Sequence, residues 1–468
     1  MKNIFFIMAD QFRADCIGYD GNPYIVTPNL NQLASDSKFF KRGYSPCPIC
    51  VPARACSITG MKPSKTGFFN NDFGVVWDYT NTVVERLRNS GYQTINIGKN
   101  HYKPVRAHLG YEINCLYETG VAENGMPSEY HRWLKDKAPS YVEDTAMTMN
   151  RNTYLVRPWT ADRELHPTEW TVTEAIEHVK GRDPSRPLFM KLSFHRPHPP
   201  IDPPEMYWNM YRDAELPGPA IGDWAPVFDE DTTCLMPFEG RINEKMLMRA
   251  KRGYYAQIEH IDAQIGRFID YLKQVKLYDD SMIVFTADHG EMMGDHNMFR
   301  KGPAFEGSAR IPYIVKFPES MHMKGIEDVP VSLLDFAPTF LDQASLPIPE
   351  EYDGVSLFKL LSDHSIRDVV MGESYRKNKL VVTGGMYAVS SRYKYVWNSW
   401  EGRELLFDLL EDPKELHDLS ANVELKGVLA EMRQLVIDEY ATRPEDGMLD
   451  EKGNLLKGRI LPNYRKPL

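Results

Sequence analysis

Polar residues that could bind a metal or exchange protons follow four apolar runs in this chain of 468 residues. The runs end at Ala9, Ile97, Phe194 and Ala287. The residues that follow them are Asp10 and Gln11, Lys99 and His101, His195 and His198, and Asp288 and His289. In an open α/β sheet, ligands bind beyond the carboxyl ends of the strands. We therefore expect these side chains, although they are far apart in the sequence, to meet at one edge of a sheet.

The residue types at this edge indicate a metal ion beside an anion. Oxygen ligands from Asp10, Gln11 and Asp288 are of the hard kind that Ca²⁺ or Mg²⁺ prefers. Cationic or protonatable side chains would surround an anionic group beside that ion, and they are Lys99, His101, His198 and Lys301. A metal held by carboxylates and ringed by cations describes a site for a sulfate or phosphate ester.

A candidate nucleophile lies in the segment Cys50-Val-Pro-Ala-Arg54. Pro52 fits the first turn of a helix, so we expect Cys50 at a helix N-terminus, where free amides favour bound anions. Arg54 lies one helical turn further and can point at the same anion. On chemistry alone, these residues predict a nucleophilic cysteine of low pKa.

The spacing of Cys47 and Cys50 also fits a redox pair or half of a zinc site. A zinc site would need a second pair of ligands at similar spacing, which the sequence lacks. A redox motif would belong to a much smaller, thioredoxin-sized unit. Six cysteines, three of them between residues 47 and 56, do not make a disulfide framework for a chain of this length. We therefore favour the nucleophile.

Alternating strand and helix patterns predict the elements that position these residues. Strands are expected over residues 3–9, 92–98, 187–194, 281–287 and 311–317. Helices are expected from residue 27 through 33 and over 82–89, 171–180, 244–275 and 333–344. This order predicts a large doubly wound α/β domain with a mainly parallel sheet. Residues 102–167, which are weakly periodic and rich in aromatic side chains, predict a long insertion over the sheet edge.

After about residue 360 the pattern changes to short strands, expected over 370–373, 380–390 and 393–397, followed by a helix over 425–440. We interpret residues 1–360 as the catalytic α/β domain. Residues 361–468 are interpreted as a smaller C-terminal α+β subdomain with a small antiparallel sheet and a helix.

The composition excludes several partners. A formal net charge of −10 provides no excess of positive charge for binding nucleic acid or an anionic membrane surface. No stretch is long and apolar enough to span a bilayer, and the apolar run at the N-terminus is too short for a signal peptide. As written, the sequence predicts a cytoplasmic protein; a leader removed upstream would make it periplasmic or secreted. The oligomeric state cannot be read from the sequence.

The motifs together resemble the sulfatase family, the formylglycine-dependent sulfatases of the alkaline phosphatase superfamily. Cys50-x-Pro52-x-Arg54 followed by Thr59-Gly60 is similar to the family signature. The likeness continues over nearly the whole chain in Ala9-Asp10-Gln11, Gly98-Lys99-x-His101, Pro197-His198-Pro199, Asp288-His289-Gly290-Glu291, Gly294-Asp295-His296 with Lys301, and Asp408-Leu409-x-x-Asp412-Pro413-x-Glu415. The resemblance implies an alkaline-phosphatase-like fold and a sulfuric ester hydrolase. It also implies a maturation enzyme that oxidises Cys50 to formylglycine.

The resemblance implies a role for each matching residue. The metal ligands would be Asp10, Gln11, Asp288, His289 and the modified Cys50. Arg54 and Lys99 would hold the formylglycine and the sulfate, and His101 the formylglycine hydroxyl. Lys301 would hold the sulfate, and His198 would face the leaving group.

Two positions depart from the commonest family pattern. Many sulfatases have Asp where this chain has Gln11 and Asn where it has His289, although both departures recur in bacterial branches. They remove negative charge from the metal site. We expect Ca²⁺, with Mg²⁺ and Mn²⁺ as the alternatives.

The implied mechanism uses the two hydroxyls of the hydrated aldehyde. One hydroxyl, with Asp288 as base, attacks sulfur, while His198 helped by Lys301 protonates the departing alkoxide. His101 then takes the proton of the second hydroxyl, and the hemiacetal collapses to expel sulfate. An unmodified cysteine or serine lacks the second hydroxyl, so a sulfated enzyme could not readily release its sulfate.

Two other functions stay open at this point. A phosphonate monoester or phosphodiester hydrolase of the same superfamily shares the Arg196–Pro200 segment and both metal-ligand pairs, whereas Lys99-x-His101 favours a sulfatase. An unconverted Cys50 would leave a non-catalytic anion-binding protein. For a sulfatase, a small carbohydrate or glycosaminoglycan-derived sulfate is the leading substrate.

We also expect Glu306 and Arg310 to form a buried pair that fixes the loop of Lys301, and His296 to orient that loop.

Overall fold

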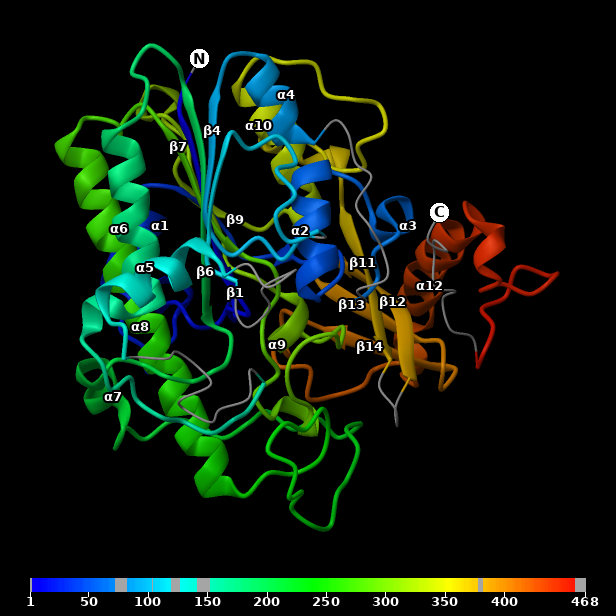
Figure 1. Ribbon diagram of the computed structural model, residues 1–468. Helices are drawn as coiled ribbons and strands as arrows, with labels where there is room; N and C mark the ends of the chain where they lie inside the picture. Colours follow the sequence, from blue (N-terminus) through cyan, green and yellow to red (C-terminus); the bar gives the residue numbers. More distant parts are fainter. Residues whose placement is uncertain are drawn as a thin grey trace.

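An eight-stranded sheet with helices on both faces forms the centre of the part of the chain that the structure describes (Figure 1). The structure is a computed structural model and describes residues 2–71, 82–102, 104–118, 127–140, 152–377 and 382–458. In chain order the strands of this sheet are β1 (Ile4–Asp10), β2 (Lys38–Phe40), β4 (Gln93–Gly98), β5 (Ile113–Leu116), β6 (Leu188–Pro197), β7 (Met282–Ala287), β8 (Tyr313–Lys316) and β9 (Gly325–Glu327).

The sheet is mainly parallel, as predicted. Its spatial order is β5-β4-β6-β1-β7-β8-β2-β9, with β1 near the middle. Neighbours from β5 to β7 run parallel, while β8 is antiparallel to both β7 and β2. Every residue of β1 is buried, which is why its sequence is a continuous apolar run rather than an alternating one.

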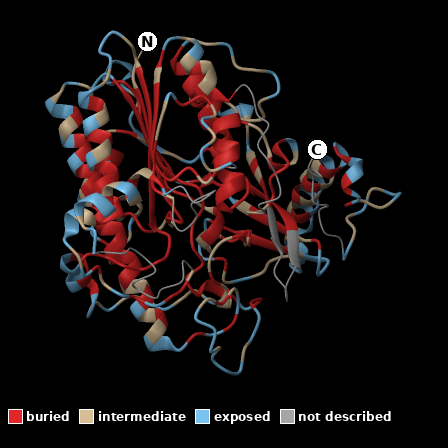
Figure 2. Cartoon of the chain, viewed as in Figure 1, coloured by how far each residue is buried: buried red, intermediate tan, exposed pale blue. Residues whose placement is uncertain are grey.

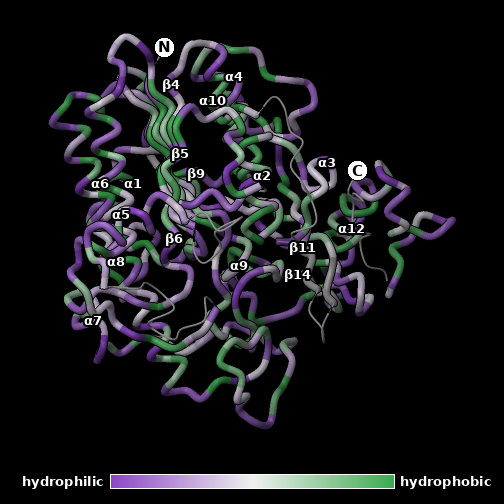
Figure 3. Tube along the Cα trace, viewed as in Figure 1, coloured by the Kyte–Doolittle hydropathy of each residue, from purple (hydrophilic) through white to green (hydrophobic). Residues whose placement is uncertain are grey.

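Helices cover the two faces of this sheet (Figure 1). One face carries α1 (Pro28–Ser35), α6 (Pro167–Lys180) and α8 (Glu244–Gln274); the other carries α2 (Cys50–Thr59), α4 (Val83–Asn89) and α10 (Phe336–Gln343). Successive side chains of β1 point to opposite faces. Phe5 therefore packs on Phe268 of α8, at 5.7 Å between ring centroids, while Phe6 packs on Phe340 of α10 at 5.2 Å. The resulting core is the buried, hydrophobic centre of Figures 2 and 3.

The other helices and small strands lie around this centre. The helices are α3 (Pro63–Thr66), α5 (Glu129–Lys137), α7 (Glu205–Tyr211), α9 (Glu306–Ala309), α11 (Leu357–Ser362) and α12 (Lys426–Ala441). The strands β3 (Gly43–Tyr44) and β10 (Val331–Ser332) pair with each other. In the described ranges, no helix has the length and apolar content that crossing a membrane requires.

A four-stranded antiparallel sheet follows in the sequence, with strands β11 (Val369–Lys377), β12 (Val382–Ser390), β13 (Tyr393–Asn398) and β14 (Arg403–Asp408) in that order. Its two faces have different partners because side chains alternate along each strand. Met386, Tyr395 and Leu406 pack in one cluster with α12. Tyr387, Val396 and Phe407 face the opposite way and form a cluster that includes Trp224 and Phe305. The small sheet thus lies between α12 and the loops near α9.

Most predicted elements are confirmed, with differences at their ends. Helix α6 begins at Pro167, before the predicted residue 171, because the side chain of His166 accepts the backbone N–H of Thr168 and caps the helix. Strand β6 runs on to Pro197, beyond the predicted end at 194. Strand β14 of the small sheet and the short strands β2, β5 and β9 of the large sheet were not predicted. The predicted insertion supplies the edge strand β5 and helix α5; residues 103, 119–126 and 141–151 of it lie outside the described part.

Candidate active site

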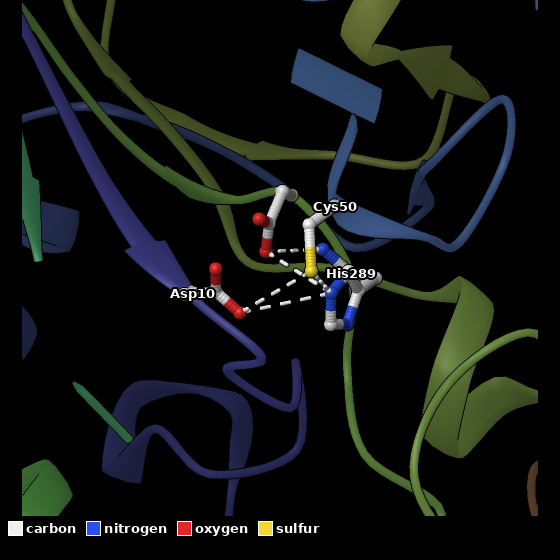
Figure 4. Close-up of side chains that lie close together, drawn as sticks. Asp10, Cys50 and His289 are labelled. Carbon is white, nitrogen blue, oxygen red and sulfur yellow. Dashed lines mark hydrogen bonds and ion pairs between the residues drawn. The ribbon is translucent and has the colours of Figure 1, made fainter. Parts of the chain in front are cut away.

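Four buried side chains from three distant segments meet beyond the ends of β1 and β7. Ligand atoms of Asp10, Cys50, Asp288 and His289 all lie within 4.8 Å of one another. Figure 4 shows Asp10, Cys50 and His289 pointing toward a common centre. All four residues have no exposed surface. The predicted convergence of strand ends is therefore confirmed for this group.

The ends of the central strands are tied together by their own backbone. The pairing of β1 with β6 shifts between Ala9 and Asp10. Beyond that shift, the N–H of His198 donates to the carbonyl of Asp10 at 3.2 Å. The N–H of Gln11, at a φ of 64°, donates to Oδ1 of Asp288 at 3.1 Å. These bonds fix the carboxylates of Asp10 and Asp288 relative to each other.

Helix α2 presents Cys50 and Arg54 to the same centre. Cys50 is its first residue, and the helix ends at Gly60, whose φ of 65° favours glycine. The guanidinium of Arg54 donates to Oδ2 of Asp288 at 2.8 Å and to Oδ2 of Asp10 at 3.3 Å. It also donates to Oγ of Ser193 at 2.9 Å. Arg54 is fully buried and so joins the nucleophile helix to three strands of the sheet.

Cations dominate the electrostatics around the nucleophile. The ammonium of Lys99 contacts Asp10, and that of Lys301 donates to Oε1 of Gln11 at 3.0 Å. Burial and Asp10 raise the pKa of the Cys50 thiol, but Lys301, His289 and Lys99 outweigh them and hold it well below its usual value. This agrees with the nucleophile of low pKa that the sequence predicted.

The ring of His289 is oriented by its own backbone. Its Nδ1 lies 2.8 Å from the carbonyl oxygen of Gly290, and since a carbonyl only accepts, Nδ1 carries the hydrogen. Its Nε2 lies 3.1 Å from Sγ of Cys50. Burial lowers the pKa of His289, but Asp288 and Cys50 outweigh it, so the net shift is upward. Nε2 is thus the atom that exchanges a proton or binds an ion.

His198 and His101 lie at the margin of the cluster. Nδ1 of His198 lies 2.8 Å from the carbonyl oxygen of Pro199, which leaves Nε2 for other partners. His101 has a φ of 56°, and its backbone N–H donates to the carboxylate of Glu118 at 2.6 Å. Its ring Nδ1 is buried and has no hydrogen-bond partner among the described residues.

The predicted site residues fall into two groups. Hydrogen bonds and ion pairs link Asp10, Gln11, Cys50, Arg54, Lys99, Asp288, His289 and Lys301 into one network. His198 joins this network through its backbone, whereas the ring of His101 joins none of these contacts in the part of the chain that the structure describes. The zinc and redox interpretations of Cys47 find no support here, since its Sγ faces the carbonyl of Phe69 at 3.6 Å.

Sequence reasoning missed residues that hold these groups in place. Glu291 accepts the amide N–H₂ of Gln11, and its other oxygen accepts from the hydroxyl of Tyr154 at 2.8 Å. Because Glu291 takes the amide nitrogen, the carbonyl oxygen of Gln11 faces Lys301. Glu291 belongs to the Asp288–Glu291 motif, so the sequence marked this residue but did not indicate its role. Ser193 lies on a buried strand that also carries Lys191, so its polar side chain gave no distinct signal.

Comparisons with known proteins identify the class of enzyme to which a chain with this fold and this cluster belongs. The sulfatase family model matches residues 2–346, and a model described as N-sulphoglucosamine sulphohydrolase, C-terminal, matches residues 294–441. An arylsulfatase of Clostridium perfringens is 39% identical over 97% of this chain and 97% of its own. The chain therefore belongs to the sulfatase family, and it is a sulfatase that hydrolyses sulfate esters.

Solved structures agree with this fold. The phosphonate monoester hydrolase of Agrobacterium radiobacter superposes with a TM-score of 0.79 and 24% identity over 100% of both chains. A protein solved in complex with its substrate D-glucosamine-2-N,6-O-disulfate superposes with a TM-score of 0.76 and 20% identity, over 96% of this chain and 99% of its own. The alkaline-phosphatase-like fold is thus confirmed.

Proposed function

We propose that this sulfatase hydrolyses small sulfated saccharides with a formylglycine at position 50 and a divalent ion. The observation that carries the proposal is the buried cluster of Asp10, Cys50, Asp288 and His289, whose ligand atoms lie within 4.8 Å of one another. The substrate class is supported by the saccharide disulfate bound to a protein of the same fold. Residues 1–360 would form the catalytic domain and 361–468 the C-terminal subdomain.

The side chains present fit a divalent ion. Asp10 and Asp288 offer carboxylate oxygens, His289 offers Nε2, and the carbonyl oxygen of Gln11 lies beside them at Lys301. Two carboxylates and an amide suit Ca²⁺ or Mg²⁺, while an imidazole nitrogen suits Mn²⁺ better than Ca²⁺. When bound, the ion supplies positive charge that polarises a sulfate oxygen and favours the deprotonated nucleophile. Elemental analysis of protein purified without added metals tests which ion is held.

Conversion of Cys50 has to precede folding. The residue is fully buried, as is the rest of α2, so a maturation enzyme can reach it only on the unfolded chain. A formylglycine at this position supplies a hydrated aldehyde, whose second hydroxyl allows the sulfated enzyme to release sulfate and re-form the aldehyde. Co-expression with a formylglycine-generating enzyme, followed by the mass of the peptide that contains residue 50, tests the conversion.

The chain's own groups then have separate tasks. Arg54 and Lys99 hold the nucleophile and the sulfate, and Lys301 adds charge from the other side. The Nε2 of His198 is left free by the bond of Nδ1 to Pro199, so it can exchange a proton with the leaving oxygen. Nδ1 of His101, which has no hydrogen-bond partner among the described residues, can take the proton that releases sulfate. Asp288 orients the attacking hydroxyl.

Phosphonate monoester or phosphodiester hydrolysis is the second candidate, favoured by the likeness to the Agrobacterium radiobacter enzyme. The 39% identity with the arylsulfatase of Clostridium perfringens favours the sulfatase. Turnover of an aryl sulfate, an aryl phosphonate and a phosphodiester should be compared on protein with verified formylglycine. We expect kcat/KM for the sulfate to be higher by about tenfold or more, a difference of about 1.4 kcal/mol in transition-state binding. Faster phosphonate turnover, or a thiol-only mass in active protein, would overturn the proposal.

A panel of saccharides sulfated at different ring positions, with choline sulfate and an aryl sulfate as references, then tests the substrate class. We expect at least one sulfated saccharide to be hydrolysed with a higher kcat/KM than both references. If choline sulfate or the aryl sulfate is preferred throughout, the saccharide part of the proposal fails while the sulfatase chemistry stands.

A further inference from the structure

A buried lysine of the small sheet lies against the loop that carries Lys301. Lys394, on β13, has no exposed surface. Its ammonium lies 3.0 Å from Oε1 of Glu306 and 2.9 Å from Oε1 of Glu415. A buried charge is tolerated only when it is paired, so this contact is a specific arrangement rather than a solvated surface pair.

Glu306 is the start of α9, and it lies five positions after Lys301. Its backbone N–H donates to Oε2 of Glu415 at 2.7 Å. Its carboxylate also accepts from the hydroxyl of Tyr44 at 2.9 Å and pairs with Nε of Arg310 at 3.0 Å. The predicted pair of Glu306 and Arg310 is therefore present, although both side chains are partly exposed rather than buried as predicted, and Lys394 and Glu415 complete it from the C-terminal side.

Aromatic contacts hold the same loop from the other end. The ring of Trp224 lies 4.4 Å from that of Phe305 and 4.6 Å from that of His296. Its indole N–H donates to the backbone carbonyl of Glu415 at 2.7 Å. The loop of Lys301 is thus fixed both before and after the lysine, by residues that also contact the segment around Glu415. The ring of His296 serves this support, as the sequence predicted.

The small sheet also contacts the segment that leads into Cys50. The hydroxyl of Tyr387 donates to the carbonyl of Ser45, and the N–H of Glu373 donates to the carbonyl of Pro46 at 2.8 Å. The hydroxyl of Ser45 in turn donates to the carbonyl of Asp288 at 2.6 Å. One sheet therefore supports the approach to the nucleophile and the loop of Lys301 together.

We propose that Lys394 and Glu415 are positioning residues, which hold Lys301 at the anion through α9. The proposal rests on the proposed role of Lys301 and gives a task to the late Asp412-Pro413-x-Glu415 motif. Without the ammonium of Lys394, the carboxylate of Glu415 would lose its lysine partner and face that of Glu306, which would keep only Arg310 and Tyr44, and like charges repel. The start of α9 would shift, and Lys301 would move with it away from Gln11.

The test compares Lys394→Met and Glu415→Gln with Arg433→Met. Arg433 is the matched control because it pairs at 2.5 Å with Glu404 of the same sheet, on the side of α12. At equal formylglycine content, we expect kcat/KM to fall about tenfold or more for K394M, severalfold for E415Q and less than twofold for R433M. Because an anion contact is weakened, KM should rise for small sulfate esters.

A double-mutant cycle with Lys301→Ala separates positioning from general stability. If Lys394 acts through Lys301, adding K394M to K301A should lower kcat/KM by less than about twofold. Hydrogen exchange over residues 298–310 should rise in K394M and stay unchanged in R433M. Effects that multiply in the double mutant, or unchanged exchange in this loop, would overturn the proposal.

The two proposals can fail separately. An inactive but converted wild type would refute the proposed function, whereas the exchange measurement would still test the support of the loop. Should K394M not fold, the same exchange and KM measurements on E415Q decide the matter, since this change keeps the size of the side chain.

Discussion

The two sheets serve the site in different ways. The strands of the large sheet between β5 and β7 are parallel, so the carboxyl ends of β1, β4, β6 and β7 bring Asp10, Lys99, Ser193 and Asp288 into one group of hydrogen bonds and ion pairs. The small sheet is antiparallel, and one of its faces packs on the loops that carry Trp224 and Phe305. The parallel sheet thus brings the candidate site residues together, and the antiparallel sheet supports the loops beside them.

The largest effect should come from the nucleophile. Replacing Cys50 by alanine removes the side-chain heteroatom from which formylglycine would be made, so we expect sulfate-ester turnover to fall by at least about 10⁴-fold. The matched control is Cys47→Ala, a change at another buried cysteine that leaves position 50 intact. An equal loss of turnover in both variants would indicate that Cys47 and Cys50 act as a pair. It would contradict the assignment of the chemistry to position 50 and the strand ends of the large sheet.

Next in size is the buried arginine that joins α2 to the strand ends. Arg54→Met leaves Asp10 and Asp288 without their shared partner, and breaking a buried ion network costs about 3–5 kcal/mol of unfolding free energy. Chemical denaturation should show this loss. The control is Arg392→Gln in the small sheet, an exposed partner of Asp408, for which we expect no measurable change. A stable R54M protein would contradict the account of the cluster.

A smaller effect is expected from the support of Gln11. Glu291→Gln removes the carboxylate that fixes the amide of Gln11, and groups that orient metal ligands typically contribute 10- to 100-fold, so we expect metal affinity to weaken by about that factor. Calorimetric titration of metal-free protein measures it. Glu259→Gln on α8, a mostly buried acid outside the cluster, is the control. Unchanged affinity in E291Q would remove Gln11 from the proposed ligands.

The smallest effect should come from the aromatic contact between the two sheets. Trp224→Phe loses one hydrogen bond to Glu415 but keeps a ring against Phe305, so unfolding free energy should fall by about 1 kcal/mol. We expect kcat/KM to change less than threefold, by analogy with a single neutral contact. A loss as large as that of K394M would mean that the ring, rather than the ion pairs, positions the loop.

Much of the large sheet was predictable from the sequence because its signals are local. The apolar run of β1 and the helical period of α8 each report burial within a few residues. The short strands β2, β5 and β9 of this sheet were missed, as was β14 of the small sheet. The packing of the small sheet depends on two different partners, α12 on one face and Trp224 on the other. Such partners are distant in sequence and leave no local pattern.

The sequence alone indicated which residues are candidates for the chemistry and in what order they follow the strands, because motif spacing and strand ends are properties of short segments. How those residues are held in place is visible only in the tertiary structure. The bond of Glu291 to Gln11, the burial of Arg54 between two carboxylates and the contact of Lys394 with Glu306 each join residues remote along the chain. The physical reason is that hydrogen bonds and ion pairs depend on distances in space, which the folded core fixes.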